Sequence, residues 1–102
     1  MDATEIDRVE DMIARYGDRF IQRIFTEGEI AYCRRKRNSA ESFASRFAAK
    51  EAVMKALGTG ARSVAWRDIE VLPDRRGKPM VYLYGGARQR AATIGLPIAM
   101  YS

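Results

Sequence analysis

The sequence has 102 residues, of which 47% are apolar and 30% are charged, and its formal net charge is +5. A chain of this length forms at most one domain, and this composition excludes an intrinsically disordered protein. The single cysteine, Cys33, cannot form an internal disulfide, and the lack of histidine excludes a histidine-based triad and most zinc sites within the chain.

The expected location is the cytoplasm. No apolar run approaches the roughly 18 residues that a membrane-spanning helix needs. The first five residues are acidic and polar and do not have the features of a signal peptide. A lone cysteine fits a reducing compartment. We therefore expect no membrane partner.

The basic residues gather in the first third of the chain. Such a concentration serves solubility, or it attracts an acidic partner such as a nucleic acid, an anionic membrane or an acidic protein. The charge alone leaves these alternatives open. The residues are Arg19, Arg23, Arg34, Arg35, Lys36 and Arg37.

The first third also predicts three helical segments. Apolar residues at helical spacing predict an amphipathic helix that ends near Gly17, and the pattern continues as a short helical turn at 20–24. Thr26 and Glu29 have the spacing of a capping box, in which each side chain bonds the other residue's backbone. A third helix is therefore predicted at 27–35.

A long central helix is predicted at 40–57, because strong helix formers fill this stretch almost without a break. Ser39 is its expected N-cap, and Gly58 its expected end. Glu51 and Lys55 lie one turn apart on one edge. A carboxylate, an ammonium and a glycine-flanked turn are what a metal-assisted phosphate site needs, but the same spacing gives an ordinary exposed ion pair.

The second half predicts an antiparallel hairpin. Residues 64–66 and 69–72 are β-prone, and the segment 80–84 alternates in the manner of a strand. Between them, 74–79 reads as a turn with Gly77 as its residue of positive φ.

After the hairpin, the sequence predicts a short helix at 87–94 and the beginning of a further strand at 98–102. The expected fold class is α+β: N-terminal helices, a long central helix and a small antiparallel sheet. The chain is expected to form one domain over 1–102.

The central helix carries a specific signature. It closely resembles the central motif of bacterial holo-acyl-carrier-protein synthase, the short trimeric type within the 4′-phosphopantetheinyl transferase superfamily. Further segments resemble the opening, the second helical block and the hairpin of that family, so the resemblance covers nearly the whole chain. The matching segments are RFAAKEA at 46–52, KA at 55–56, GTG at 58–60, DATEIDR at 2–8, RF at 19–20, RIFT at 23–26, Glu29, WRDIEV at 66–71 and GKP at 77–79.

Two departures from the family are apparent. The family normally begins with a strand that ends in Gly-x-Asp, of which only Asp2 remains here. It also continues past Ser102 into a strand with a Ser-His-Thr segment and then a final strand. The chain therefore resembles a version of the enzyme domain that lacks the first strand and the C-terminal strands.

The resemblance implies transfer of the 4′-phosphopantetheine group from coenzyme A to a serine of apo-acyl carrier protein in fatty acid biosynthesis. Adenosine 3′,5′-bisphosphate would be the second product. Asp2 and Glu51 match the family's Mg²⁺-binding carboxylates, and Lys55 would reach a phosphate or leaving-group oxygen. The base that takes the serine proton, either Glu51 or a metal-bound water, stays open.

The resemblance also implies a coenzyme A site between neighbouring subunits of a homotrimer. Phe43 and Arg46 match positions near the nucleotide part, although Phe43 could equally be a core residue. The expected coenzyme-binding residues are Phe43, Arg46, Lys55, Gly58, Thr59, Gly60, Lys78 and Pro79.

The resemblance predicts a specific partner for the basic first third of the chain, because acyl carrier proteins are strongly acidic. By analogy with the family, the first helix docks the carrier protein, with an apolar methionine among the charges. The expected contact residues are Arg8, Met12, Arg15, Arg19 and Arg23.

Two alternatives belong to other classes. One is a basic nucleic-acid-binding domain, which is disfavoured because no nucleic-acid motif is present and aromatic residues do not interleave with the basic ones. The other is an inactive fragment that keeps only the fold and the partner contacts.

Overall fold

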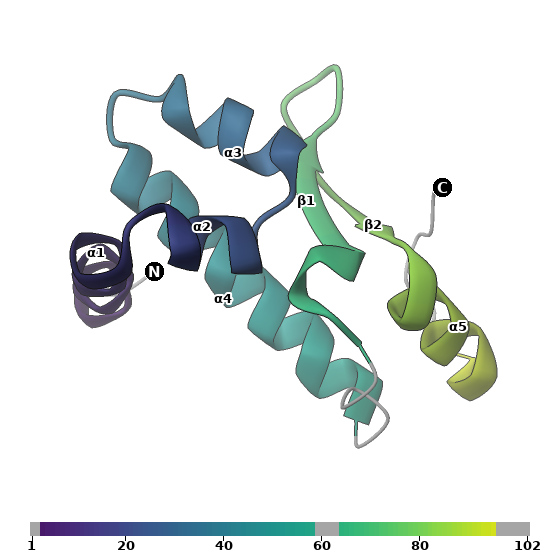
Figure 1. Ribbon diagram of the computed structural model, residues 1–102. Coiled ribbons are helices and arrows are strands. Elements are labelled where there is room, and N and C mark those ends of the chain that lie inside the picture. Colours follow the sequence, from purple (N-terminus) through teal and green to yellow (C-terminus); the bar gives the residue numbers. More distant parts are fainter. Residues whose placement is uncertain (1–2, 59–63, 96–102) are drawn as a thin grey trace.

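The computed structural model describes residues 3–58 and 64–95 and has the expected α+β architecture. Figure 1 shows the long helix α4 running diagonally through the molecule, with the N-terminal helices around one half and the hairpin and α5 beside the other half. The elements in chain order are α1 (Ala3–Tyr16), α2 (Asp18–Ile24), α3 (Glu27–Arg34), α4 (Ser39–Leu57), η2 (Trp66–Asp68), β1 (Ile69–Pro73), β2 (Pro79–Leu83) and α5 (Gly85–Ile94).

Local signals position the first three helices as predicted. Gly17, with φ of 57°, separates α1 from α2. Thr26 and Glu29 form both bonds of the capping box: the Glu29 N–H donates to Thr26 Oγ1 at 3.2 Å, and the Thr26 N–H donates to Glu29 Oε1 at 2.9 Å. This reciprocal cap starts α3 at Glu27.

The predicted start of the central helix is wrong by one residue. Asn38, and not Ser39, is the N-cap of α4: its Oδ1 accepts from the Glu41 N–H at 3.1 Å, and its side-chain amide donates to the Glu41 carboxylate at 2.9 Å. Asparagine and serine are comparable N-caps, and the additional bond between the two side chains favours Asn38 in this position. The predicted end is confirmed, because Gly58 has φ of 71°.

The hairpin is confirmed, but one predicted strand segment is wrong. Strands β1 and β2 pair antiparallel, with Ile69 opposite Leu83, and Gly77 in the turn has φ of 84°. Residues 64–66 do not join the sheet. The Asp68 carboxylate accepts from the Ala65 N–H at 3.2 Å and closes the turn η2, so the strand begins only at Ile69.

The C-terminal helix α5 begins two residues earlier than predicted. Its first residue is Gly85, and Gly95 ends it in the left-handed conformation with φ of 67°. The strand predicted at 98–102 lies outside the described residues.

Helix α4 contributes to two separate hydrophobic clusters. Its N-terminal half packs Phe43 and Ala44 against the first three helices. Its C-terminal half packs Val53 and Leu57 against the hairpin and α5. Because α4 is held from two sides, the motif that it carries has a defined orientation relative to both halves of the molecule.

Candidate functional site

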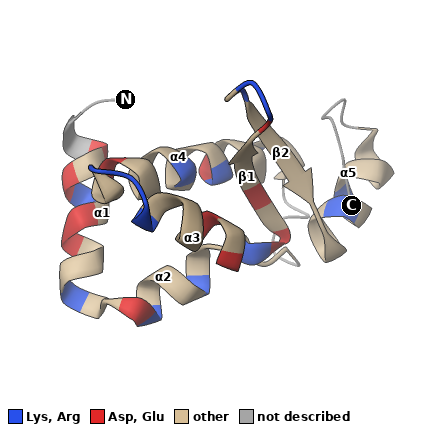
Figure 2. Cartoon of the chain, turned by 90° about the horizontal axis from the view of Figure 1, so that it is seen from above, with Lys and Arg blue, Asp and Glu red and all other residues tan. Residues whose placement is uncertain are grey.

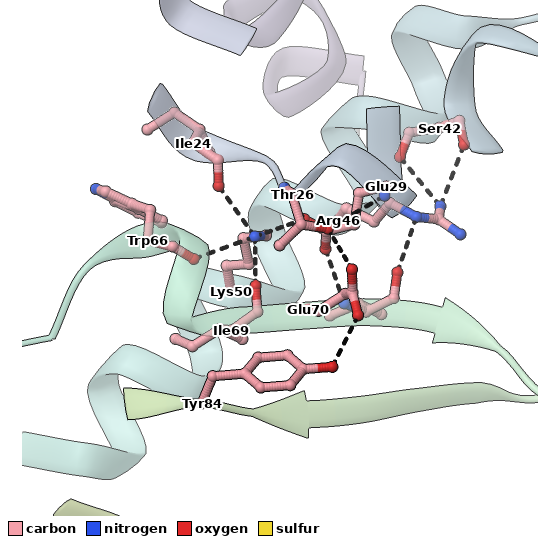
Figure 3. A network of polar contacts seen from close by, with 11 residues as sticks. Ile24, Thr26, Glu29, Ser42, Arg46, Lys50, Trp66, Ile69, Glu70 and Tyr84 are labelled. Atoms are coloured by element: carbon pink, nitrogen blue, oxygen red, sulfur yellow. Dashed lines mark hydrogen bonds and ion pairs between the residues drawn. The ribbon is translucent and has the colours of Figure 1, made fainter. Parts of the chain in front are cut away.

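A completely buried ion pair lies at the centre of the motif in α4. The Nζ atom of Lys50 lies 2.6 Å from Glu29 Oε1, and both side chains are 0% exposed. The same ammonium donates to the backbone carbonyls of Ile24 at 3.0 Å, of Trp66 at 3.2 Å and of Ile69 (Figure 3). The ammonium thus joins α4 to the end of α2, to η2 and to β1.

The sequence analysis assigned no role to Lys50, although its position on an apolar face of the predicted helix indicated one. Lys50 lies seven residues after Phe43 and seven before Leu57, both of which are buried. Seven residues make two helical turns, so these side chains share one face of α4. A lysine on an apolar face indicates a charge that needs a buried partner.

Polar side chains from α3 and α4 close the outer edge of β1. The Val71 N–H donates to Glu29 Oε2 at 2.7 Å, and the Val71 carbonyl accepts from Arg46 Nε at 3.1 Å. Lys50 binds the carbonyl of Ile69 on the same edge. These bonds satisfy backbone groups that a neighbouring strand would otherwise pair. They also fix the rotation of α4 about its axis.

The anchored helix turns Glu51 toward α1. Arg8 Nη2 lies 3.1 Å from Glu51 Oε1 and 2.9 Å from Glu5 Oε2. The Glu51 side chain remains 35% exposed. The carboxylate therefore faces solvent beside the first turns of α1. Asp2, its predicted metal-binding partner, lies outside the described residues.

The other residues predicted to contact phosphate groups lie at the end of α4 or directly after it in the sequence. Lys55 is exposed one turn after Glu51. A Cβ added at Gly58 would meet the Arg90 guanidinium at 3.7 Å, and Arg90 Nε donates to the Leu57 carbonyl at 2.9 Å. The predicted Thr59 and Gly60 lie outside the described residues.

Arg46 borders a cavity of about 350 Å³ that is strongly basic. Lys36 and Arg37 line it as well, Glu41 is the single carboxylate in its wall, and the other lining side chains are Asn38, Ser42 and Ser45. Figure 2 shows the connection between α3 and α4, which carries Lys36 and Arg37, as a continuous basic segment. Three cations against one carboxylate make this cavity suited to an anion.

Phe43, the other residue predicted near the nucleotide, occupies the core. Its side chain is 3% exposed, and its ring centroid lies 4.9 Å from that of Phe25. This position supports the core role that the sequence analysis left open for Phe43.

A second cavity, also of about 350 Å³, lies between α1 and α2. It combines Met12, Tyr16 and Phe20 with two cations, Arg19 and Arg23. Of the five residues predicted to dock a partner, three line this cavity. The other two residues, which lie on α1, form ion pairs: Arg15 lies 3.7 Å from Asp11, and Arg8 contacts the two glutamates described above.

Lys78 and Pro79 are exposed at the turn of the hairpin. Figure 1 shows this turn extending away from the end of α4 where Gly58 lies. A single chain therefore does not bring the hairpin turn together with Gly58 at the end of α4.

Two features are absent from the residues that the structure describes, 3–58 and 64–95. No group of three or more Cys, Asp or Glu side chains is placed to hold a metal ion there. No helix in these ranges is long and apolar enough to cross a membrane.

The fold and the polar motif define an α+β protein that presents a carboxylate and a basic cavity on one central helix. Comparison with known families gives this class its name. The family model described as the 4′-phosphopantetheinyl transferase superfamily matches residues 1–98, so the chain belongs to that superfamily.

Relatives with known names agree with this assignment. The chain is 54% identical over 97 residues to the holo-[acyl-carrier-protein] synthase of Solibacter usitatus, covering 94% of this chain and 78% of that protein. Its fold is similar to the crystal structure of holo-[acyl-carrier-protein] synthase from Neisseria meningitidis, with a TM-score of 0.76, 28% identity and coverage of 88% and 73%. The acyl carrier protein synthase of Plasmodium yoelii, solved with ADP bound, matches with a TM-score of 0.69, 34% identity and coverage of 88% and 70%. The resemblance inferred from the sequence motifs is confirmed.

Proposed function

We propose that this chain is a holo-acyl-carrier-protein synthase, which transfers the 4′-phosphopantetheine group of coenzyme A to a serine of apo-acyl carrier protein. The observation that carries the proposal is the orientation of the motif on α4. Arg46 lines a basic cavity, while Glu51 faces the start of α1 from the same helix. The high identity to a named synthase supports the same function.

The reaction divides into tasks for separate groups. The serine hydroxyl attacks the phosphorus that carries the pantetheine arm, and the P–O bond to the adenosine-bearing phosphate breaks. The hydroxyl proton passes to a base, and adenosine 3′,5′-bisphosphate leaves. Lys55, exposed beyond Glu51, is proposed to neutralise charge on the leaving phosphate.

The basic cavity is the proposed site for the nucleotide part of coenzyme A. Its cations Lys36, Arg37 and Arg46 are suited to phosphate groups, and Arg46 offers the planar guanidinium that binds phosphate well. The ADP bound to the Plasmodium yoelii relative supports a nucleotide ligand for this fold.

Glu51 and Asp2 are the proposed ligands of Mg²⁺. The Glu51 carboxylate is partly exposed beside α1, and Mg²⁺ commonly takes only one or two protein carboxylates together with waters and phosphates. A bound Mg²⁺ would neutralise the pyrophosphate charge.

The second cavity is the proposed docking site for the acidic carrier protein. Its arginines would attract acidic side chains, and Met12, which is 36% exposed, offers an apolar contact between them. Arg8 and Arg15 would extend the basic surface along α1.

A homotrimer with active sites between subunits is proposed as the assembly. It would bring Lys78 and Pro79 of one subunit to the coenzyme site of another; within one chain, the hairpin turn extends away from the end of α4 where Gly58 lies. A single domain, a cytoplasmic location and a role in fatty acid biosynthesis belong to the same proposal.

Loading of apo-acyl carrier protein tests the function. The chain is incubated with coenzyme A, Mg²⁺ and apo-carrier protein, and the carrier's mass is followed together with the release of adenosine 3′,5′-bisphosphate. We expect Glu51→Gln to reduce loading at least a hundredfold, whereas Glu27→Gln, a change of an exposed carboxylate on α3, leaves it intact. Full loading by Glu51→Gln would overturn the metal assignment, and no loading by the unmodified chain at any Mg²⁺ concentration would overturn the function.

A further inference from the structure

One aromatic ring lies between two of the cations that line the basic cavity. Tyr32 is in the last turn of α3, and the centroid of its ring is 4.3 Å from Arg46 Cζ and 4.7 Å from Lys36 Nζ. Both distances are well within the roughly 6 Å over which a cation is attracted to the face of an aromatic ring. Tyr32 is not itself among the residues that line the cavity.

The ring completes the immobilisation of Arg46. Hydrogen bonds hold the edges of the guanidinium: Nε donates to the Val71 carbonyl at 3.1 Å, and Nη1 donates to the Ser42 hydroxyl at 3.1 Å and to its carbonyl at 3.3 Å. The Tyr32 ring contacts the guanidinium near its centre. Because the guanidinium is contacted both at its edges and at its centre, it is held in the cavity wall.

The ring also counteracts repulsion between the two cations. Lys36 and Arg46 carry like charges in one cavity wall, and the negative face of an aromatic ring attracts both. The phenol responds to this environment: a hydrogen bond with Lys36, then the charges of Lys36 and Arg46, lower the pKa of Tyr32, and desolvation opposes the effect. The charges are thus close enough to the ring to act on it.

We propose that Tyr32 is a positioning residue for the coenzyme site, holding Arg46 and Lys36 with its ring so that both cations face the phosphates of the nucleotide. The inference depends on the proposed function, because it takes the basic cavity as the site of the nucleotide part. Tyr32 touches no reacting atom in this role and acts through the two cations.

Two substitutions distinguish the contribution of the Tyr32 ring to nucleotide binding from that of its hydroxyl. Tyr32→Phe keeps the ring and removes the hydroxyl, whereas Tyr32→Leu removes the ring and keeps an apolar side chain. The probe is adenosine 3′,5′-bisphosphate, whose dissociation constant is measured by titration calorimetry with the full chain. We expect Tyr32→Leu to weaken binding about five- to tenfold, the range for one or two partly exposed cation–π contacts. Tyr32→Phe, which loses only the hydrogen bonding of the hydroxyl, should weaken binding less than about threefold.

Steady-state kinetics give a second readout that a loss of folding would not reproduce. We expect Tyr32→Leu to raise KM for coenzyme A by a similar factor, while KM for the carrier protein stays unchanged. If thermal melting shows that Tyr32→Leu is unfolded, Tyr32→Met, with its unbranched apolar side chain, takes its place. Unchanged nucleotide affinity in the folded variant, or an equal loss in Tyr32→Phe, would overturn the role of the ring.

Arg46→Ala distinguishes a failure of this inference from a failure of the proposed site. If Arg46→Ala weakens nucleotide binding and Tyr32→Leu does not, the cavity binds the nucleotide and only the role of Tyr32 is refuted. If neither variant changes binding while the unmodified chain loads carrier protein, the nucleotide binds elsewhere. That result overturns both the cavity assignment and the inference.

Discussion

The Lys50 ammonium and the Glu29 carboxylate form an ion pair of 2.6 Å that is completely shielded from solvent. Each partner makes further bonds. Glu29 accepts from the backbone N–H groups of Thr26 and Val71, and Lys50 donates to three backbone carbonyls. The pair therefore links α2, α3, α4, η2 and β1 through one point. Burial lowers the pKa of the Lys50 ammonium, and the charge of Glu29 opposes that effect.

Removing both partners of this pair should cost less than the sum of the losses from removing each one alone. Lys50→Met leaves the Glu29 carboxylate buried without its counter-charge, so we expect a loss of about 3–5 kcal/mol in the free energy of unfolding. The double variant Lys50→Met/Glu29→Gln should lose less than the sum of the single variants, as urea denaturation would show. Lys55→Met, an exposed lysine on the same helix, is the matched control and should change stability by less than about 0.5 kcal/mol. Additive losses would contradict direct coupling of the two charges.

The N-cap of α3 should make a measurable contribution to the free energy of unfolding. Thr26 Oγ1 accepts from the Glu29 N–H and also donates to the Glu70 carboxylate on β1. Thr26→Ala removes both bonds, so we expect a destabilisation of about 1–2 kcal/mol in urea denaturation. Thr26→Ser keeps the hydroxyl and should recover most of the loss. If Thr26→Ser is as unstable as Thr26→Ala, the loss of stability comes from the methyl group and not from the hydroxyl.

Cys33 should make the free energy of unfolding depend on pH. Its thiol is buried, and desolvation raises its pKa above the ordinary value of 9.0. As pH rises past 9.0, the thiol ionises in the unfolded chain before it does so in the folded one. The unfolded chain then binds fewer protons, so the contribution of Cys33 to stability is complete below pH 9 and falls above it.

Comparison with Cys33→Ala isolates this contribution. The difference in unfolding free energy between the unmodified chain and the variant should shrink by up to about 1.4 kcal/mol per pH unit above pH 9. Urea denaturation at pH 7.5, 9 and 10 measures it. A difference that stays constant across this range would mean that the thiol has the same pKa in both states.

Docking of the carrier protein should depend on the arginines of the α1–α2 cavity. Arg19→Glu reverses a charge in its wall, so we expect KM for the carrier protein to rise about tenfold and KM for coenzyme A to stay within twofold. Arg15→Glu, on the neighbouring helix α1 and paired with Asp11, should raise KM for the carrier protein less. Arg88→Glu, with the same charge change on an exposed position of α5, is the control.

The salt dependence of these variants gives a further check. Raising the ionic strength should increase KM for the carrier protein in the unmodified chain more steeply than in Arg19→Glu, because exposed charges are screened beyond about 8–10 Å. Equal increases of KM for both substrates in Arg19→Glu would refute a separate docking cavity.

The sequence by itself determined the elements that depend on neighbouring residues. The capping box at Thr26, the break at Gly17 and the turn at Gly77 are interactions among residues a few positions apart, and each occurs as predicted. The motif at 46–52, together with the matching segments before and after it, identified the family. The errors at Asn38 and at 64–66 arose where two local signals competed: an asparagine beside a serine, and a carboxylate-capped turn within a β-prone segment.

Only the tertiary structure decided which motif side chains face inward. Helical spacing placed Glu51 and Lys55 on one edge, but it did not show that Lys50 meets Glu29 or that Arg46 lies against Tyr32. These partners are distant in the chain, because Lys50 is 21 residues from Glu29 and Arg46 is 14 residues from Tyr32. The energy of a buried charge depends on all the groups that surround it in space, and no periodicity within one helix contains that information.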